Sequence, residues 1–165
     1  MTGPIDIAKG DLDAGARTVW AEARGEGFVG MCAVASVLAN RTRIAKAYVG
    51  KHGKPHPLFG DGTLRSAATW RVRPDAKHQF SCWNEDDPNL PKLKAVDTTD
   101  EAFRWALYAM LGVTLGHIID PTREATHYMN RAWLDRVKWD DGMMVTAEIG
   151  KHVFFKEKPW AQKGA

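Results

Sequence analysis

The chain has 165 residues, of which 44% are hydrophobic, and 23 Lys and Arg against 20 Asp and Glu give a formal net charge of +3. This length and apolar content predict one globular domain, residues 1–165, and no stretch approaches the ~18 uninterrupted apolar residues of a membrane span. The two cysteines, Cys32 and Cys82, lie far apart without a CxxC pair, which argues against a zinc knuckle or a disulfide scaffold.

The N-terminal part of the chain predicts two helices followed by a loop. A first helix starts at a cap, Asp11 or Asp13, and keeps a helical spacing of apolar residues up to Ala23. Residues 28–41 (FVGMCAVASVLANR) are apolar on nearly all sides and predict a helix buried in the middle of the domain. Residues 44–62 are polar and rich in Gly and Pro, so we expect a loop or an insertion.

The rest of the chain predicts more helix and a short β element. A short helix is expected around residues 64–70 and a loop at residues 84–92. A capped apolar pattern predicts a second core helix at residues 99–116. Residues 120–130 are expected to start as a turn, and residues 149–156 (IGKHVFFK) to form a short strand. The fold class is therefore mainly α, with a short β element (α+β).

Charge is unevenly distributed along the chain. Residues 41–77 contain nine Lys or Arg against two Asp, a balance of +7, whereas residues 85–101 contain six acids against two Lys, a balance of −4. A basic face attracts anionic partners such as nucleic acid, a phosphate-rich envelope or a wall polymer, although such a run also occurs as a plain solvated face. No aromatic-interleaved RNA motif or zinc finger supports the nucleic-acid interpretation.

Glu22 stands where the first predicted helix ends, in the stretch WAEARGEG. The negative end of the helix dipole disfavours a charged carboxylate there, and burial beside Trp20 would disfavour it further. A glutamate that keeps its proton is what a general acid needs to protonate a glycosidic oxygen. The alternative is a surface ion pair between Glu22 and Arg24 or Arg17. Glu26, beyond the helix end, is more typical of a loop acid or a cap for the next helix.

Four blocks follow one another in the chain: ARTVWAEARGEGFVGMCAVASVLANR, HQFSCW, DPTREATHYMN and IGKHVFF. In this order they resemble the SleB-type cell-wall hydrolase family, which includes spore-cortex-lytic enzymes, over residues 12–155. The resemblance implies a lysozyme-like, mainly helical fold and cleavage of the peptidoglycan glycan strand, and it places the catalytic glutamate at Glu22. The basic stretch at residues 41–77 is long compared with the family pattern.

The middle blocks supply the other candidate site residues. In HQFSCW, Gln79 and Ser81 offer hydrogen bonds, while Phe80 and Trp83 offer faces for sugar rings, although one of these two rings is expected in the core. In ATHYMN, several polar side chains stand next to one another, and the resemblance places them across the cleft from the glutamate. We predict that the following residues hold substrate: Glu26, Gln79, Phe80, Ser81, Trp83, Thr126, His127, Tyr128 and Asn130. His152 is interpreted as structural.

The reaction type depends on whether a second carboxylate exists. Hydrolases need two acids flanking the bond, and the remaining candidates occupy a turn (Asp120) or a charged stretch (Asp135, Asp140 and Asp141). A single acid/base suffices if the C6 hydroxyl of muramic acid attacks the anomeric carbon, and the resemblance also points to this lytic transglycosylase route. A hydrolytic muramidase cutting the same bond, between N-acetylmuramic acid and N-acetylglucosamine, is the alternative.

Other classes of protein remain open at this point. A peptidoglycan amidase or endopeptidase would use Cys82 as the nucleophile and His127 as the base. However, Cys82 stands among aromatic neighbours with no sign of an activated thiol. A non-catalytic glycan-binding module would keep the aromatic residues without needing Glu22, and a nucleic-acid-binding domain would explain only the basic stretch.

The expected partner is bacterial peptidoglycan, with an anionic envelope surface held through residues 41–77. The N-terminus has neither a basic start nor an apolar run, which predicts no signal peptide. We therefore expect an endolysin-like protein that stays in the cytoplasm, the host cytoplasm if phage-encoded, until it is released to the periplasm or cell wall. We expect a monomer that uses no cofactor or metal, binds no nucleic acid and does not insert stably into a membrane.

Overall fold

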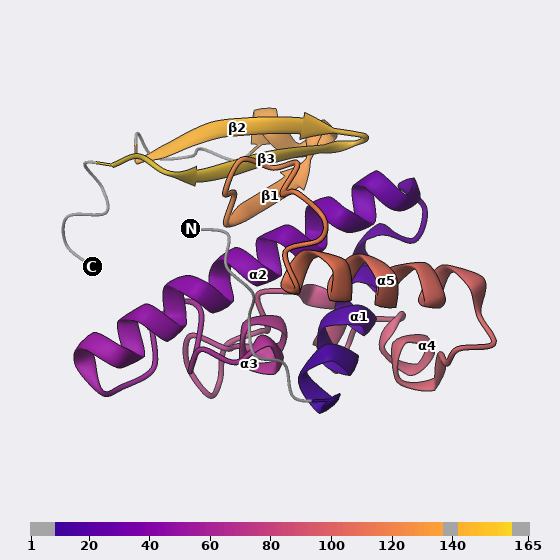
Figure 1. The fold of residues 1–165 in the computed structure, drawn as a ribbon, viewed down its shortest axis with the longest axis horizontal. Helices are drawn as coiled ribbons and strands as arrows, with labels where there is room; N and C mark the ends of the chain where they lie inside the picture. The colour runs from indigo at the N-terminus through magenta and orange to yellow at the C-terminus, as the bar shows by residue number, and fades with distance from the viewer. Residues whose placement is uncertain (1–8, 137–141, 160–165) are drawn as a thin grey trace.

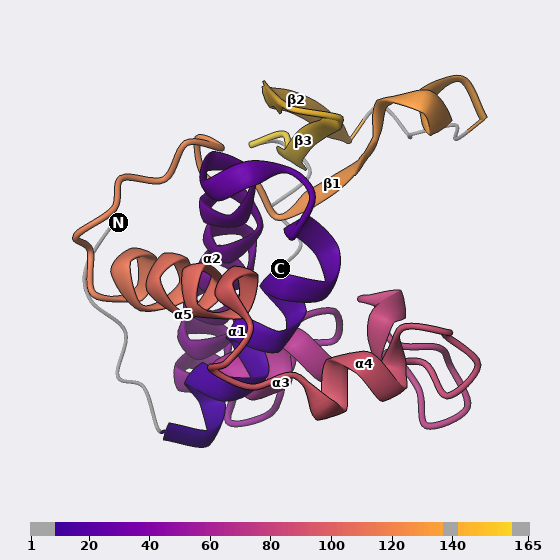
Figure 2. The same ribbon diagram turned by 90° about the vertical axis from the view of Figure 1, so that its right-hand side faces the viewer.

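The computed structural model describes residues 9–136 and 142–159 as a helical body with a small sheet beside it (Figure 1). The elements follow in this order: α1 Lys9–Ala23, α2 Gly27–His52, α3 Leu64–Thr69, the 3-10 turn η1 Ser81–Trp83, α4 Leu90–Ala95, α5 Glu101–Thr114, β1 His127–Asn130, the 3-10 segment η2 Arg131–Arg136, β2 Met143–Ile149 and β3 His152–Glu157. In the two views the sheet lies above the helices, next to α2, and α4 lies at the lower end (Figure 2).

Helix α2 is the centre of the domain, as its all-round apolar sequence predicted. Every residue from 30 to 42 is buried, and the helix contacts α1, α3, α5 and β2. Small residues such as Ala33, Ala35 and Ala39 let these neighbours approach closely, and all three are fully buried. Because α2 touches each part of the fold, its side chains can reach both the helical body and the sheet.

The expected loop at residues 44–62 is wrong for its first half, because α2 continues to His52. Polar residues in this part, such as Lys46 and Lys51, lie on the exposed side, while Ala45 keeps facing the core. The helix ends only at Gly53, whose φ of 66° is left-handed and whose N–H donates to the Val49 carbonyl at 2.8 Å. One-sided polarity is typical of an amphipathic helix, so it did not signal a loop.

Two further expectations concern α4 and α5. The loop expected at residues 84–92 is wrong at its end, because α4 begins at Leu90. The proline in its first turn is compatible with a helix, since the N–H that proline lacks would have no helical partner there. The core helix expected at 99–116 is confirmed as α5, with Asp100 accepting a hydrogen bond from the Phe103 N–H at 2.8 Å.

The sheet has the order β1-β3-β2, with both pairs antiparallel. The strand expected at residues 149–156 corresponds to the central strand β3, whereas β1 and β2 were not predicted. Register places Tyr128 opposite Phe154 and Asn130 opposite His152. Phe154 is 1% exposed and belongs to the core, so the face of the sheet that carries Tyr128 packs against the helical body.

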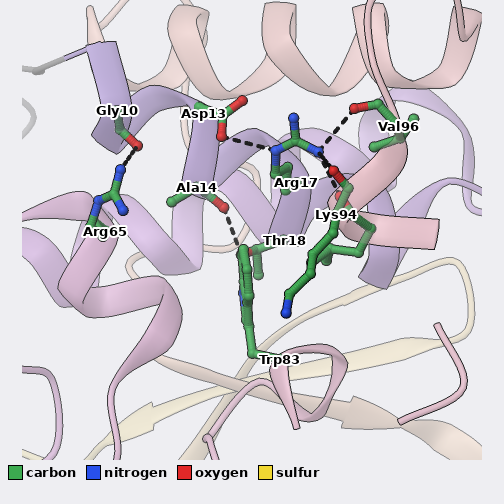
Figure 3. Close-up of polar contacts among 10 residues, drawn as sticks. Gly10, Asp13, Ala14, Arg17, Thr18, Arg65, Trp83, Lys94 and Val96 are labelled. Atoms are coloured by element: carbon green, nitrogen blue, oxygen red, sulfur yellow. Dashed lines mark hydrogen bonds and ion pairs between the residues drawn. The ribbon is translucent and has the colours of Figure 1, made fainter. Parts of the chain in front are cut away.

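Helix α1 is held from two sides by hydrogen bonds to residues far away in the sequence (Figure 3). Arg17 donates to the carbonyls of Leu93 at 2.6 Å and Val96 at 2.9 Å at the end of α4. The indole N–H of Trp83 donates to Thr18 at 2.9 Å. These contacts fix the position of the helix whose last turn carries Glu22. No helix in residues 9–136 and 142–159 is long and apolar enough to cross a membrane.

Candidate active site

Glu22 meets the sheet at the end of α1. The Tyr128 hydroxyl of β1 donates to Glu22 Oε2 at 2.7 Å, and the same carboxyl group interacts electrostatically with the Cys82 thiol of η1. Burial, together with the nearby carboxylate, raises the pKa of both Tyr128 and Cys82. Both groups therefore keep their protons at neutral pH, and Tyr128 acts as a donor toward Glu22. Three separate parts of the chain meet at this carboxyl group.

Arg41 brings a positive charge to the same place. Its side chain is buried, at 6% exposure, and Nε donates to the Thr126 carbonyl at 2.7 Å. The guanidinium lies over the rings of Phe80, at 4.8 Å, and Phe59, at 5.3 Å from the ring centroids. Burial lowers the pKa of Arg41 to about 10, while electrostatic interactions with Tyr128 and Glu22 act in the opposite direction, so the group stays cationic at neutral pH.

Sequence reasoning missed Arg41 because it counted this residue in a hydrated basic segment. The structure corrects that expectation: the segment is not uniformly exposed, and its first cation is inside the protein. The signal that could have found it is the position of Arg41 at the end of an all-apolar helical pattern, where a charged residue needs a buried partner.

The loop before β1 is anchored to α2 by Asp120. Its carboxylate accepts the Thr122 N–H at 2.7 Å, the Thr122 hydroxyl at 2.6 Å, the Glu124 N–H at 2.9 Å and the Asn40 amide at 2.9 Å. These bonds hold Arg123 and Glu124 in left-handed conformations, with φ of 56° and 67°, which non-glycine residues rarely adopt. The start of β1 is thereby set in place. Asp120 is engaged in structure and is not directed at Glu22.

His127 interacts electrostatically with Arg41 and is itself a neutral imidazole. Its burial, and then the positive charge of Arg41, lower the pKa of His127 to about 4. The ring centroid is 6.0 Å from that of Phe59, and Nδ1 lies 2.9 Å from the Thr126 hydroxyl. At neutral pH the His127 ring can therefore donate one hydrogen bond and accept another, but it carries no charge.

The remaining predicted residues occupy three kinds of position. Phe80, 3% exposed, is a core ring under Arg41, and Trp83 is half-buried with its indole N–H on Thr18. Gln79 and Ser81 are both exposed, and the Gln79 amide donates to the Leu58 carbonyl. In β1, the Asn130 side chain accepts a hydrogen bond from the Ala132 N–H at 3.0 Å, which stabilises the turn from the end of β1 into η2.

Glu26 is tied to the turn between β2 and β3. Its Oε2 accepts the N–H of Lys151 at 3.1 Å, and Gly150, with φ of 57°, leaves no Cβ in the way of this carboxylate. His152, which the sequence assigned to structure, packs edge-on against Tyr128 with ring centroids 5.0 Å apart. Arg41 therefore bonds to Thr126 and interacts electrostatically with Glu22, His127 and Tyr128, whereas Glu26 bonds to the β2–β3 turn.

No group of three or more His, Cys, Asp or Glu in the described part of the chain has a geometry that would hold a metal ion. The chemistry available at this place is that of one carboxyl group with hydrogen-bond donors, a buried cation and aromatic rings. Such a set favours proton transfer by Glu22.

A helical body whose acid-bearing helix end meets a small sheet is a lysozyme-like α+β fold, and solved structures agree. The chain is similar to the catalytic domain of the germination-specific lytic transglycosylase SleB from Bacillus anthracis, with a TM-score of 0.58 and 24% identity over 93% of this chain and 99% of that one. It is also similar to the SleB catalytic domain from Bacillus cereus, with a TM-score of 0.56 and 23% identity over 94% and 97%. These likenesses establish the lysozyme-like fold.

Residues 25–155 match the model of the Cell Wall Hydrolase family, and the chain therefore belongs to this family of peptidoglycan-degrading enzymes. No curated protein sequence matches the chain. The matched range begins three residues after Glu22, so the assignment of the acid depends on the contacts of Glu22 described above.

Proposed function

We propose that the protein cleaves the peptidoglycan glycan strand between N-acetylmuramic acid and N-acetylglucosamine as a lytic transglycosylase, with Glu22 as the single acid/base. The observation that carries the proposal is the 2.7 Å hydrogen bond that Tyr128 donates to Glu22, with the Cys82 thiol and the Arg41 cation interacting electrostatically with the same carboxyl group. The printed description of the Bacillus anthracis relative as a lytic transglycosylase supports the reaction type.

The contacts of Glu22 suggest how one residue serves both steps. Tyr128 donates to Oε2, so Oε1 is the oxygen that carries the proton toward the glycosidic oxygen. When Glu22 gives up this proton, the positive charge of Arg41 stabilises the carboxylate that forms. The carboxylate then takes the proton of the muramic acid C6 hydroxyl as that oxygen attacks the anomeric carbon. The products are a 1,6-anhydro end and a regenerated acid.

The other nearby acids favour this single-acid route over hydrolysis. Glu26 accepts a backbone N–H in the β2–β3 turn, and Asp87 accepts the Asn89 N–H at 2.8 Å. Asp120 is saturated by four hydrogen bonds. Asp140 and Asp141 lie outside the described residues. An inverting or retaining hydrolase would need a second carboxylate facing Glu22 across the bond.

The test is mass spectrometry of muropeptides released from purified peptidoglycan by the wild type, Glu22→Gln and Glu26→Gln. Glu22→Gln keeps the shape of the side chain but cannot donate the proton, so we expect cleavage to fall at least about a hundredfold. Glu26→Gln is the matched control and should lose far less. Anhydro ends support the proposal, whereas reducing ends would indicate a muramidase and free stem peptides an amidase. A reversed order of the two variants would move the acid to Glu26.

A further inference from the structure

A hollow lies between the α1–α2 turn and the start of α5. It encloses about 410 Å³, and it is lined by Arg24, Gly27, Phe28, Met31, Glu101, Ala102 and Trp105. Arg24 follows Glu22 by two residues, so the hollow begins close to the end of α1. None of its lining residues belongs to the group around Arg41.

Exposed aromatic rings continue from this hollow along α5. Phe28 and Trp105 pack edge to face with ring centroids 5.4 Å apart, and Trp105 is 5.9 Å from Tyr108. All three are exposed, at 40%, 48% and 63%. A row of flat rings in solvent is uncommon for a monomeric domain and marks a binding surface.

Helix α5 carries this surface in addition to its core face. Phe103, Ala106, Met110 and Val113 are buried against the body of the protein. The opposite side carries its own apolar residues, exposed to solvent: Trp105, Tyr108, Leu111 and Leu115. A helix that packs on one face only is expected to be polar on the other, and α5 is not. The second face therefore has a purpose other than folding.

The walls of the hollow also carry opposite charges. Arg24 lies over the Trp20 ring at 4.2 Å and donates to the Asn89 side chain at 3.3 Å, and Glu101 stands in the first turn of α5. Among the residues that the structure describes, neither Arg24 nor Glu101 has an ion-pair partner. A guanidinium and a carboxylate beside a flat aromatic face suit a ring that is apolar above and below and has hydroxyl and amide groups around its edge.

We propose that this hollow, with the ring of Trp105 as its platform, binds an N-acetylated sugar of the glycan strand outside the cleavage site. The inference rests on the proposed glycan-cleaving function. Trp105 would stack on the C–H face of the pyranose, Glu101 would accept from its hydroxyl groups, and Arg24 would donate to the acetamido or lactyl oxygens. Long strands would be held at two places, and short oligosaccharides at one.

The test measures binding of Glu22→Gln protein to purified glycan strands from which the stem peptides have been removed by an amidase. Added to this background, Trp105→Leu keeps apolar bulk but loses the flat face, and we expect binding about tenfold weaker. Trp105→Phe keeps a ring and should retain most of the affinity. Trp133→Ala, which removes a similarly exposed indole from η2, is the matched control and should bind normally.

The same substitutions in the active enzyme separate this inference from the proposed function. Trp105→Leu should raise KM for long strands with an unchanged kcat, and leave cleavage of a short soluble oligosaccharide unaffected. If the wild type makes no glycan ends, the proposed function fails. If the wild type makes glycan ends but Trp105→Leu binds glycan strands as tightly as Trp133→Ala does, the hollow is not a sugar site. Loss of anionic vesicle binding or of self-association in Trp105→Leu, with glycan binding intact, would assign the surface to a membrane or a second copy and overturn the inference.

Discussion

The Tyr128 hydroxyl donates a 2.7 Å hydrogen bond to Glu22 Oε2, joining the first strand of the sheet to the last turn of the first helix across 106 residues of sequence. Because this bond occupies one carboxyl oxygen, it selects the other oxygen for proton transfer. The sheet therefore does more than cover the helices: it orients the acid.

Removing this hydroxyl tests its importance for the reaction. We expect Tyr128→Phe to lower kcat by about tenfold to a hundredfold, since one donor to the reacting carboxyl group is lost while the ring still packs against Phe154. The measurement is the initial rate of glycan cleavage together with the melting temperature. Tyr108→Phe, on the exposed side of α5, is the control. An unchanged kcat in Tyr128→Phe would mean that the bond is only structural.

The thiol of Cys82 provides a test between classes of enzyme. Its raised pKa, caused first by burial and then by Glu22, keeps it protonated, and the groups that act on it are carboxyl groups rather than an activating histidine. Cys82→Ser should keep most of the activity, because serine can also donate to Glu22, and should cost about 1 kcal/mol of stability from the loss of the buried sulfur. Muropeptide release and thermal unfolding measure the two effects. Loss of activity with an unchanged melting temperature would favour a cysteine amidase.

Titration of His127 should make stability depend on pH. The pKa of His127 falls from 6.5 in the unfolded chain to about 4 in the folded protein, because burial and Arg41 disfavour the imidazolium. The unfolded state thus binds more protons between these values, so stability is fully present above pH 6.5 and is lost as the pH falls toward 4. At about 1.4 kcal/mol per pKa unit, the loss should amount to about 3 kcal/mol.

Urea unfolding at a series of pH values measures this loss. His127→Gln should flatten the decline between pH 6.5 and 4. Part of the slope should remain, because burial also lowers the pKa of His56. An equally steep decline in His127→Gln would show that His127 is not the titrating group.

The basic segment at residues 41–77 is expected to speed encounter with an anionic wall or envelope, without a part in bond cleavage. Lys46, Lys51 and Lys54 are exposed, and changing all three to Gln should lower activity on intact walls at low salt and flatten its salt dependence. The reason is that such attraction is screened over ~10 Å at 0.1 M salt and ~3 Å at 1 M.

Lys92→Gln with Lys94→Gln, on exposed positions of α4, is the control for the loss of positive charge as such. Cleavage of a short soluble oligosaccharide should be the same in both sets of variants. Equal losses on walls and on the soluble substrate would contradict steering and indicate that the segment shapes the active-site groove.

Local patterns in the sequence were enough to predict several elements. The apolar spacing before Ala23, the all-round apolar stretch of α2 and the Asp100 cap of α5 each depend on residues a few positions apart. These signals also placed Glu22 at a helix end. Strands β1 and β2 escaped prediction, because a strand of four residues and one with a bulge near Thr146 have little periodicity of their own.

The sequence by itself determined which residue types were available: one acid at the end of a helix, a buried central helix and polar groups beside an aromatic ring in ATHYMN. Only the tertiary structure decided that Tyr128 donates to this acid, that Cys82 interacts with it, and that Arg41 is buried although its basic segment is otherwise exposed in large part. The physical reason is that these contacts join residues 60 to 106 positions apart. Packing around α2 brings them together, since a buried cation and a buried hydroxyl must find partners wherever the fold supplies them.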